Sequence, residues 1–146
     1  MRYLRKYNEK FTDMTDPNLM KLQNEFRDFA NDCLAYLVDE GFIISVAVRN
    51  AYDGCLLEFT LVKNQDDINF GRERINFTWN SIKDDFIPFL EMVKEKFIVD
   101  HIITFIKNKI TTLNIDVVIN DDTNVGGSIL RDDYIRNISF FIKDYK

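Results

Sequence analysis

The spacing of apolar residues along this chain changes three times. Apolar residues recur every three or four positions in residues 17–40, alternate with other residues in 42–63, return to the helical spacing in 82–110 and alternate again in 115–144. Spacings of three and four are typical of an amphipathic helix, and alternation is typical of a half-buried strand. The pattern therefore predicts an α+β protein in which an antiparallel or mixed sheet is backed by two to three helices, in the order helix, strands, helices, strands.

The first helix and the hairpin after it have clear boundaries. Asp16 places a capping carboxylate before Pro17, whose missing N–H costs nothing at the first helical position. Gly41 ends the helix, and Asp53 with Gly54 supplies the turn between the two following strands. These signals predict a helix whose apolar stripe is covered by the apolar face of a hairpin.

Pro88 complicates the second helical segment. Ser81 and Asp84 resemble a capping box at its start. A proline in a helix interior costs about 3 kcal/mol, so either the helix starts near Asp85, with Pro88 in its first turn, or it bends at Pro88. Because the apolar stripe continues beyond Asp100, which is a candidate cap, the segment predicts two helices or one with a bend.

The remaining segments predict strands around a single core. Alternation in 115–119 and 138–142 predicts a second strand pair, and a weaker strand is predicted in 68–77. A chain of 146 residues suits one domain, which we assign to 15–146, with 1–14 as an N-terminal arm. The residues predicted to form the core are Phe26, Phe29, Leu37, Ile44, Val46, Leu57, Phe59, Phe89, Val93, Val117 and Ile119.

Composition and charge narrow the class of protein. No apolar run approaches the ~18 residues needed to cross a bilayer, which argues against a membrane protein. Asp and Glu outnumber Lys and Arg by 24 to 19, and because neutralising a phosphate backbone needs a basic surface, nucleic-acid binding is disfavoured. Cys33 and Cys55 have neither zinc-site nor redox-motif spacing, so we expect free, buried thiols in an intracellular protein.

One polar loop invites a metal site. Asn120, Asp122 and Asn124 match the first, third and fifth positions of a calcium loop, but Val125 replaces its glycine and Arg131 its terminal glutamate. We therefore expect no calcium there, and the sequence indicates no other metal and no cofactor.

Candidate catalytic residues are few. His101 is the only histidine, and Asp100 beside it is predicted to point to a different side of a helix. No nucleophile elbow, zinc-protease pair or phosphate loop occurs in the sequence. The balance is against an enzyme, although a carboxylate-dependent hydrolase, which needs no characteristic spacing, stays an alternative.

Acidic residues form adjacent pairs along the chain. The pairs are Asp66 and Asp67, Asp84 and Asp85, Asp121 and Asp122, and Asp132 and Asp133. Such pairs usually mark turns and helix starts. They also suggest an alternative function, in which they mimic a phosphate backbone and the chain inhibits a host nucleic-acid-binding or defence protein.

The N-terminus carries the one resemblance to known proteins. Residues 1–9, Met-Arg-Tyr-Leu-Arg-Lys-Tyr-Asn-Glu, resemble the Met-Lys-x-Leu-Lys-Lys-Phe-Asn-Glu openings of many small, mostly uncharacterised proteins of large tailed bacteriophages. The opening is also similar to the capsid-targeting leaders of internal proteins in T-even-like phages. A prohead protease removes those leaders after a glutamate preceded two positions earlier by Leu or Ile, a position that Tyr7 occupies here.

The resemblance implies a phage protein located in the virion or the host cytoplasm. We expect a non-catalytic role in protein–protein binding, as a virion or assembly component or as an accessory factor acting on a host protein. The candidate binding residues combine positive charge with apolar area, and they are Arg2, Tyr3, Leu4, Arg5, Lys6 and Tyr7. The alternative for this arm is purely structural, with its apolar side chains docked on the domain.

Overall fold

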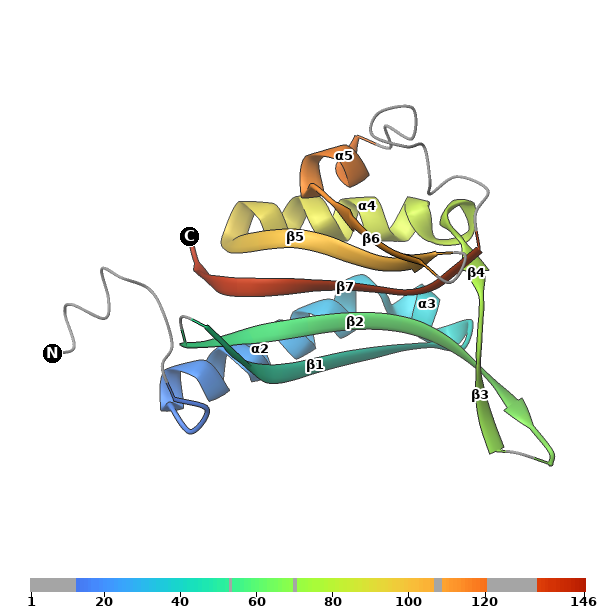
Figure 1. The fold of residues 1–146 in the computed structure, drawn as a ribbon, viewed down its shortest axis with the longest axis horizontal. Coiled ribbons are helices and arrows are strands. Elements are labelled where there is room, and N and C mark those ends of the chain that lie inside the picture. The colour runs from blue at the N-terminus through green and yellow to red at the C-terminus, as the bar shows by residue number, and fades with distance from the viewer. Residues whose placement is uncertain (1–12, 53, 70, 107–108, 121–133) are drawn as a thin grey trace, which may run out of the picture.

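The computed structural model describes residues 13–52, 54–69, 71–106, 109–120 and 134–146. This part of the chain holds four helices and seven strands (Figure 1). The helices are α2 (Pro17–Cys33), α3 (Ala35–Asp39), α4 (Trp79–Lys96) and α5 (Ile115–Ile119). The strands are β1 (Phe42–Ala51), β2 (Gly54–Asp67), β3 (Gly71–Ile75), β4 (Phe77–Thr78), β5 (Phe97–Ile106), β6 (Lys109–Leu113) and β7 (Tyr134–Tyr145).

The strands form one antiparallel sheet. Its main order is β1-β2-β7-β5-β6, while β3 pairs with the distal part of β2 and β4 pairs with β7. The predicted α+β class is confirmed, and the sheet is antiparallel rather than mixed. The C-terminal strand β7 lies in the middle of the sheet, so the last residues of the chain join its two halves.

The first helix and hairpin follow the prediction. The Asp16 carboxylate accepts a hydrogen bond of 2.8 Å from the Asn18 N–H and caps α2. The helical stretch is interrupted at Leu34 and resumes as α3, after which Gly41, with a φ of 97°, turns the chain into β1. β1 and β2 then pair without a break in register.

The segment after α4 is a strand, so the predicted helix beyond residue 97 is wrong. α4 runs through Pro88 and ends at Lys96, where the chain continues directly as β5. Ile, Val and Thr supply six of the ten residues of β5, and β-branched side chains favour extended backbone. The capping box is wrong as well, because α4 already starts at Trp79 and the Ser81 hydroxyl donates to the Thr78 carbonyl at 2.6 Å.

Helix α5 stands where alternation predicted a strand. The Asn114 side chain accepts a hydrogen bond of 2.8 Å from the Asp116 N–H and caps this short helix. Ile115 and Val118, three positions apart, are buried, whereas Val117 is half-buried. The apolar pattern of these five residues fits a helix as well as a strand. The hydrogen bond from the Asp116 N–H to the Asn114 side chain favours the helix.

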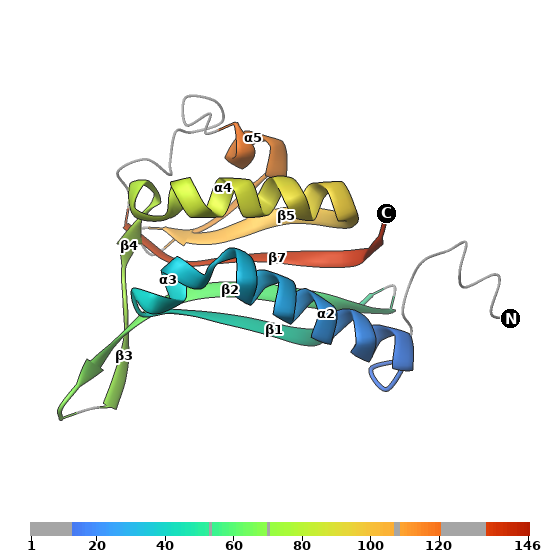
Figure 2. The same ribbon diagram turned by 180° about the vertical axis from the view of Figure 1, so that it is seen from behind.

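α2 and α4 pack on the same face of the sheet (Figure 2). Phe26 of α2 lies at the centre of this layer, with its ring centroid within 6.2 Å of those of Phe29, Phe59, Phe89, Phe97 and Phe140. Seven of the predicted core residues are buried, namely Phe26, Leu37, Val46, Leu57, Phe59, Phe89 and Val93. The others, Phe29, Ile44, Val117 and Ile119, are partly buried.

Candidate functional site

The face of the sheet opposite α2 and α4 is covered by no helix of the described residues (Figures 1 and 2). Strand pairing aligns its side chains in rows that cross all five main strands. One row holds Ile43, Val62, Asn137, Phe105 and Ile110, and the next holds Ser45, Thr60, Ser139, Ile103 and Thr112. The row on the opposite face, Val46, Phe59, Phe140, Ile102 and Leu113, is buried throughout, which confirms the assignment of the two faces.

These two outward rows contain no charged side chain, and we call their ten residues the uncharged patch. Charged residues make up 29% of the chain, so a solvated face of this width would ordinarily carry several of them. The patch instead mixes aliphatic, aromatic, amide and hydroxyl groups. At its centre the Thr60 and Ser139 hydroxyls are hydrogen-bonded at 3.0 Å, and at its edge the Ile110 side chain is 67% exposed.

Charged groups border the patch at one end of the strands. On β1 and β2, Arg49 and Glu58 form an ion pair with 3.1 Å between Nε and Oε1. On β5 and β7, the Lys143 ammonium lies 3.8 Å from the Asp100 carboxylate. The patch therefore has an ionic rim on this side.

His101 belongs to this rim because of a β-bulge. Val99 pairs with Ile142 and Ile102 with Phe140, which leaves two residues of β5, Asp100 and His101, opposite one residue of β7. The His101 Nδ1 lies 3.5 Å from the Asp100 carboxylate. The prediction that these two side chains diverge on a helix is therefore wrong, because the bulge in a strand brings them together.

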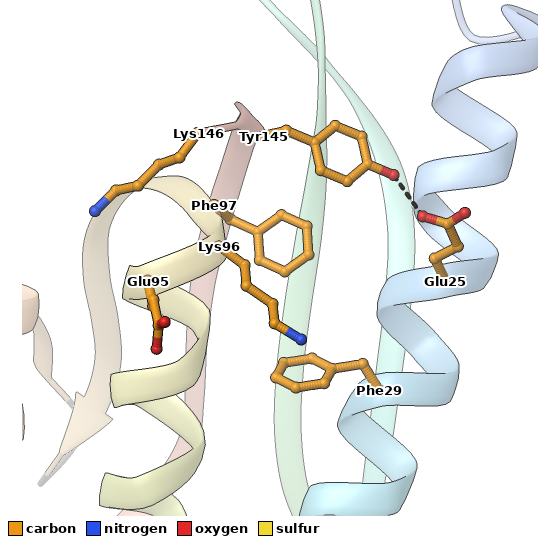
Figure 3. Close-up of a pocket in the computed structure, with 7 residues that line it drawn as sticks. All are labelled: Glu25, Phe29, Glu95, Lys96, Phe97, Tyr145 and Lys146. Carbon is orange, nitrogen blue, oxygen red and sulfur yellow. Dashed lines mark hydrogen bonds between the residues drawn. The ribbon is translucent and has the colours of Figure 1, made fainter.

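A groove between α2 and the end of α4 is the second candidate (Figure 3). It has a volume of about 390 Å³ and is lined by Glu25, Phe29, Glu95, Lys96, Phe97, Tyr145 and Lys146. The Tyr145 hydroxyl donates to the Glu25 carboxylate at 2.6 Å, and the Lys96 ammonium lies 5.1 Å from the centre of the Phe29 ring. Figure 3 shows Glu95 pointing away from the Glu25–Tyr145 pair, so the two carboxylates do not converge as an acid–base pair would.

The environments of Tyr145 and Cys33, in and near the groove, favour a structural role for both side chains. Burial raises the pKa of Tyr145, and the hydrogen bond to Glu25 raises it further. Burial also raises the pKa of the Cys33 thiol, with Asp32 adding to the shift and Lys96 opposing it. Both groups are held in their protonated forms at neutral pH, which is the opposite of activation as a nucleophile or base. Cys33 and Cys55 are free, as predicted, and only Cys55 is fully buried.

Several sequence-predicted sites lie outside the described residues. These are the candidate binding residues Arg2, Tyr3, Leu4, Arg5, Lys6 and Tyr7, the central part of the calcium-like loop, and the acidic pairs Asp121–Asp122 and Asp132–Asp133. Of the two other acidic pairs, one belongs to β2 and one to α4. Across the described ranges, no three His, Cys, Asp or Glu side chains are grouped to hold a metal ion, and no helix has the length and apolarity to cross a membrane.

The sequence alone does not predict the uncharged patch, because its residues come together only through the register in which the strands pair. The alternation placed each residue on the outward side of its own strand, but the row partners come from segments as distant as Ser45 and Ser139. The signal that the sequence does contain is the lack of charge at alternate positions in several strands.

Comparison with known proteins adds no functional assignment. No protein-family model matches the chain, and neither curated proteins nor solved structures give a significant match. Function is therefore inferred from the residues themselves.

Proposed function

We propose that this chain is a phage protein that acts by binding another protein, as a virion or assembly component or as an accessory factor acting on a host protein. The observation that carries the proposal is the uncharged patch. The centres of protein–protein interfaces are depleted of charged residues, while their rims are polar. The patch, with Arg49, Glu58, Asp100 and Lys143 at one end, has this composition.

The size of the patch supports a role as the centre of an interface. Strands about 4.8 Å apart give five strands a width of roughly 20 Å. A stable interface buries about 800 Å² on each partner, which two rows of side chains do not supply alone. The partner is therefore expected to cover the ionic rim as well, and the rim charges then favour one orientation of the partner.

The N-terminal segment is the proposed second contributor. Arg2, Arg5 and Lys6 concentrate positive charge on a protein with a net charge of −5, and Tyr3 and Tyr7 add apolar area. This combination suits an acidic groove on a partner or scaffold. The resemblance of residues 1–9 to phage leader sequences supports the same assignment.

Charge substitutions in the patch test the proposal. Ser45→Lys and Ile110→Lys each place an ammonium at an exposed edge of the patch, where folding tolerates it but a closely packed partner does not. Asn31→Lys on the exposed side of α2 is the matched control. Tagged proteins are expressed during infection, and co-purifying proteins and the content of purified virions are measured.

The expected result is that the wild type and Asn31→Lys capture the same protein or enter the same particle, whereas both patch variants lose it. Equal capture by all of these proteins, with each variant folded, would show that the patch is not the binding surface.

A further inference from the structure

The hairpin of β2 and β3 projects beyond the main sheet (Figure 1). β2 pairs with β7 only as far as Val62, and from Lys63 to Asp67 it pairs with β3. Every residue of β3 except Ile75 is exposed. We call residues 63–75 the projecting hairpin. Because two strands without a covering layer are only marginally stable in water, contact with a second molecule would stabilise this element.

The turn of the projecting hairpin combines apolar and acidic residues. Residues 66–71 read Asp-Asp-Ile-Asn-Phe-Gly and include two carboxylates and no basic residue. Ile68 is fully exposed, and the Asp66 side chain is 88% exposed. The Arg72 Nε lies 3.4 Å from the Asp66 carboxylate and offsets one of the two negative charges. The turn therefore presents an exposed isoleucine next to a net negative charge.

Aromatic walls line the groove between α2 and the end of α4 (Figure 3). The rings of Phe29, Phe97 and Tyr145 follow one another, with 6.3 Å between the first two centroids and 5.5 Å between the last two. Phe29 is half-buried and Tyr145 is 39% exposed, so both rings keep apolar surface in water. The groove volume of about 390 Å³ leaves room for an aliphatic side chain of a second molecule to cover them.

One ammonium in the groove is available to an acidic partner. The Lys96 ammonium lies 5.1 Å from the centre of the Phe29 ring and forms no ion pair among the described residues. The Glu25 carboxylate already accepts a hydrogen bond from the opposite wall, and Figure 3 shows Glu95 and Lys146 pointing away from Phe29. An occupant that joins an apolar side chain to a carboxylate therefore fits the groove, whereas a basic occupant meets Lys96.

The projecting hairpin and the groove lie at opposite ends of the molecule. Tyr145, in the groove wall, follows Ile142, which pairs with Leu57 near the start of β2. The projecting hairpin contains the other end of the same strand, and the ten residues from Leu57 to Asp67 span roughly 33 Å. Figures 1 and 2 show the same separation between the C-terminus and the hairpin. The hairpin thus cannot reach the groove of its own chain, but it can reach the groove of a neighbour.

We propose that the projecting hairpin of one copy of this chain docks in the groove of a second copy, with Ile68 on the rings of Phe29 and Tyr145 and the acidic turn beside Lys96. The partner is a second copy because the chain itself carries the apolar and acidic turn that matches an apolar groove with a free cation. Each docked copy keeps its own hairpin free at the far end, so the contact is heterologous and repeats into a ring or a filament. This inference does not depend on the uncharged patch, which lies on the opposite face of the sheet from the groove.

Concentration-dependent association of the purified full chain tests the proposal. A hairpin turn in a groove covers less than the roughly 800 Å² per partner of a stable interface, so the contact is weak and is sought at up to about 1 mM protein. In sedimentation equilibrium, the average mass is expected to rise with concentration beyond that of a dimer, and to rise less in high salt. A chain that stays monomeric over this range, or that stops at a dimer, would overturn the proposal.

Two variants each remove one half of the contact. Ile68→Ser takes the apolar side chain from the turn, and Lys96→Glu reverses the charge in the groove; both positions are exposed, so both variants are expected to fold, which circular dichroism checks. Each is expected to weaken association at least about tenfold, through lost apolar burial in the first case and repulsion from the acidic turn in the second. Tyr36→Ser, at a 75% exposed position of α3, is the matched control and keeps wild-type association.

A mixture of the two variants gives the sharpest result. Each variant retains the half that the other lacks, so an equimolar mixture of Ile68→Ser and Lys96→Glu is expected to form a one-to-one dimer that grows no further. A mixture that stays monomeric while the wild type associates would overturn the assignment. Loss of association in Ile110→Lys, with Ile68→Ser unaffected, would also overturn it and would place the self-contact on the uncharged patch. Capture of another protein is measured separately, so failure of self-association leaves the proposed function intact.

Discussion

Phe140 and Phe141 are neighbours on β7 with opposite environments, and they offer the sharpest test of the fold. Phe140 is fully buried and stacks on Phe59, with 4.6 Å between ring centroids and 20° between ring planes. Phe141 is half-buried on the face that has no helix cover among the described residues. Replacing each by alanine removes the same atoms from the two faces of a single strand.

The structure predicts very different costs for the two substitutions. A buried Phe→Ala change costs about 3–5 kcal/mol, and the loss of the stacked pair places Phe140→Ala near the upper end. Phe141→Ala is expected to cost about 1 kcal/mol, because only part of that side chain leaves water on folding. With a urea dependence of roughly 2 kcal/mol per molar, the unfolding midpoint falls by about 2 M for Phe140→Ala and by about 0.5 M for Phe141→Ala.

The assay is urea unfolding followed by the fluorescence of Trp79, the only tryptophan and fully buried. Phe141→Ala is expected to stay folded yet to lose affinity for a partner that covers the neighbouring uncharged patch. Equal midpoints for the two variants, or a lower midpoint for Phe141→Ala, would show that the two faces of β7 are assigned the wrong way round.

Three further predictions concern a hydroxyl, a tyrosine and the N-terminus. Thr104→Val is expected to stabilise the protein by about 1 kcal/mol in urea unfolding, because its Oγ1 is buried without a partner in the described structure, whereas Thr60→Val should not, because it breaks the bond to Ser139. Tyr145→Phe removes the hydrogen bond to Glu25 and should lower stability at pH 7 by less than about 1 kcal/mol. Since the folded-state pKa of Tyr145 lies above the unfolded value of about 10, this advantage of the wild type is complete below that pH and is lost as the pH rises further; a constant difference up to high pH would contradict the bond. Deleting residues 1–9 should leave the thermal midpoint nearly unchanged but abolish partner capture, and unfolding of the truncated protein would show that these residues are part of the domain.

The two halves of the fold differ in how far the sequence predicts them. Asp16, Pro17 and Gly41 bound the first helical region by backbone chemistry that acts locally, so its prediction is confirmed. The predictions for β5 and α5 are wrong, because the local sequence signals in these two segments conflict. β5 is apolar on both faces, so periodicity alone does not separate it from a buried helix, and α5 is too short for its period to decide.

The candidate site was less predictable than the fold because it depends on register and not on motifs. Ser45, Thr60 and Ser139 become one row only after β7 inserts beside β2, and nothing local to any of them signals that neighbourhood. The β-bulge is equally a product of pairing, since it exists only because Asp100 and His101 of β5 together lie opposite the single residue Phe141 of β7.

The edges of the sheet favour binding through its face. A sheet recruits a partner either by adding a strand at an open edge or by side-chain contacts across a face. The β1 edge is partly closed, because the Gln23 side chain and the Arg27 guanidinium both donate to the Val46 carbonyl at 3.1 Å. The opposite edge, β6, is only five residues long and begins with a lysine, two features that discourage strand addition. Main-chain pairing is thereby disfavoured at both edges, so recognition is left to the side chains of the uncharged patch.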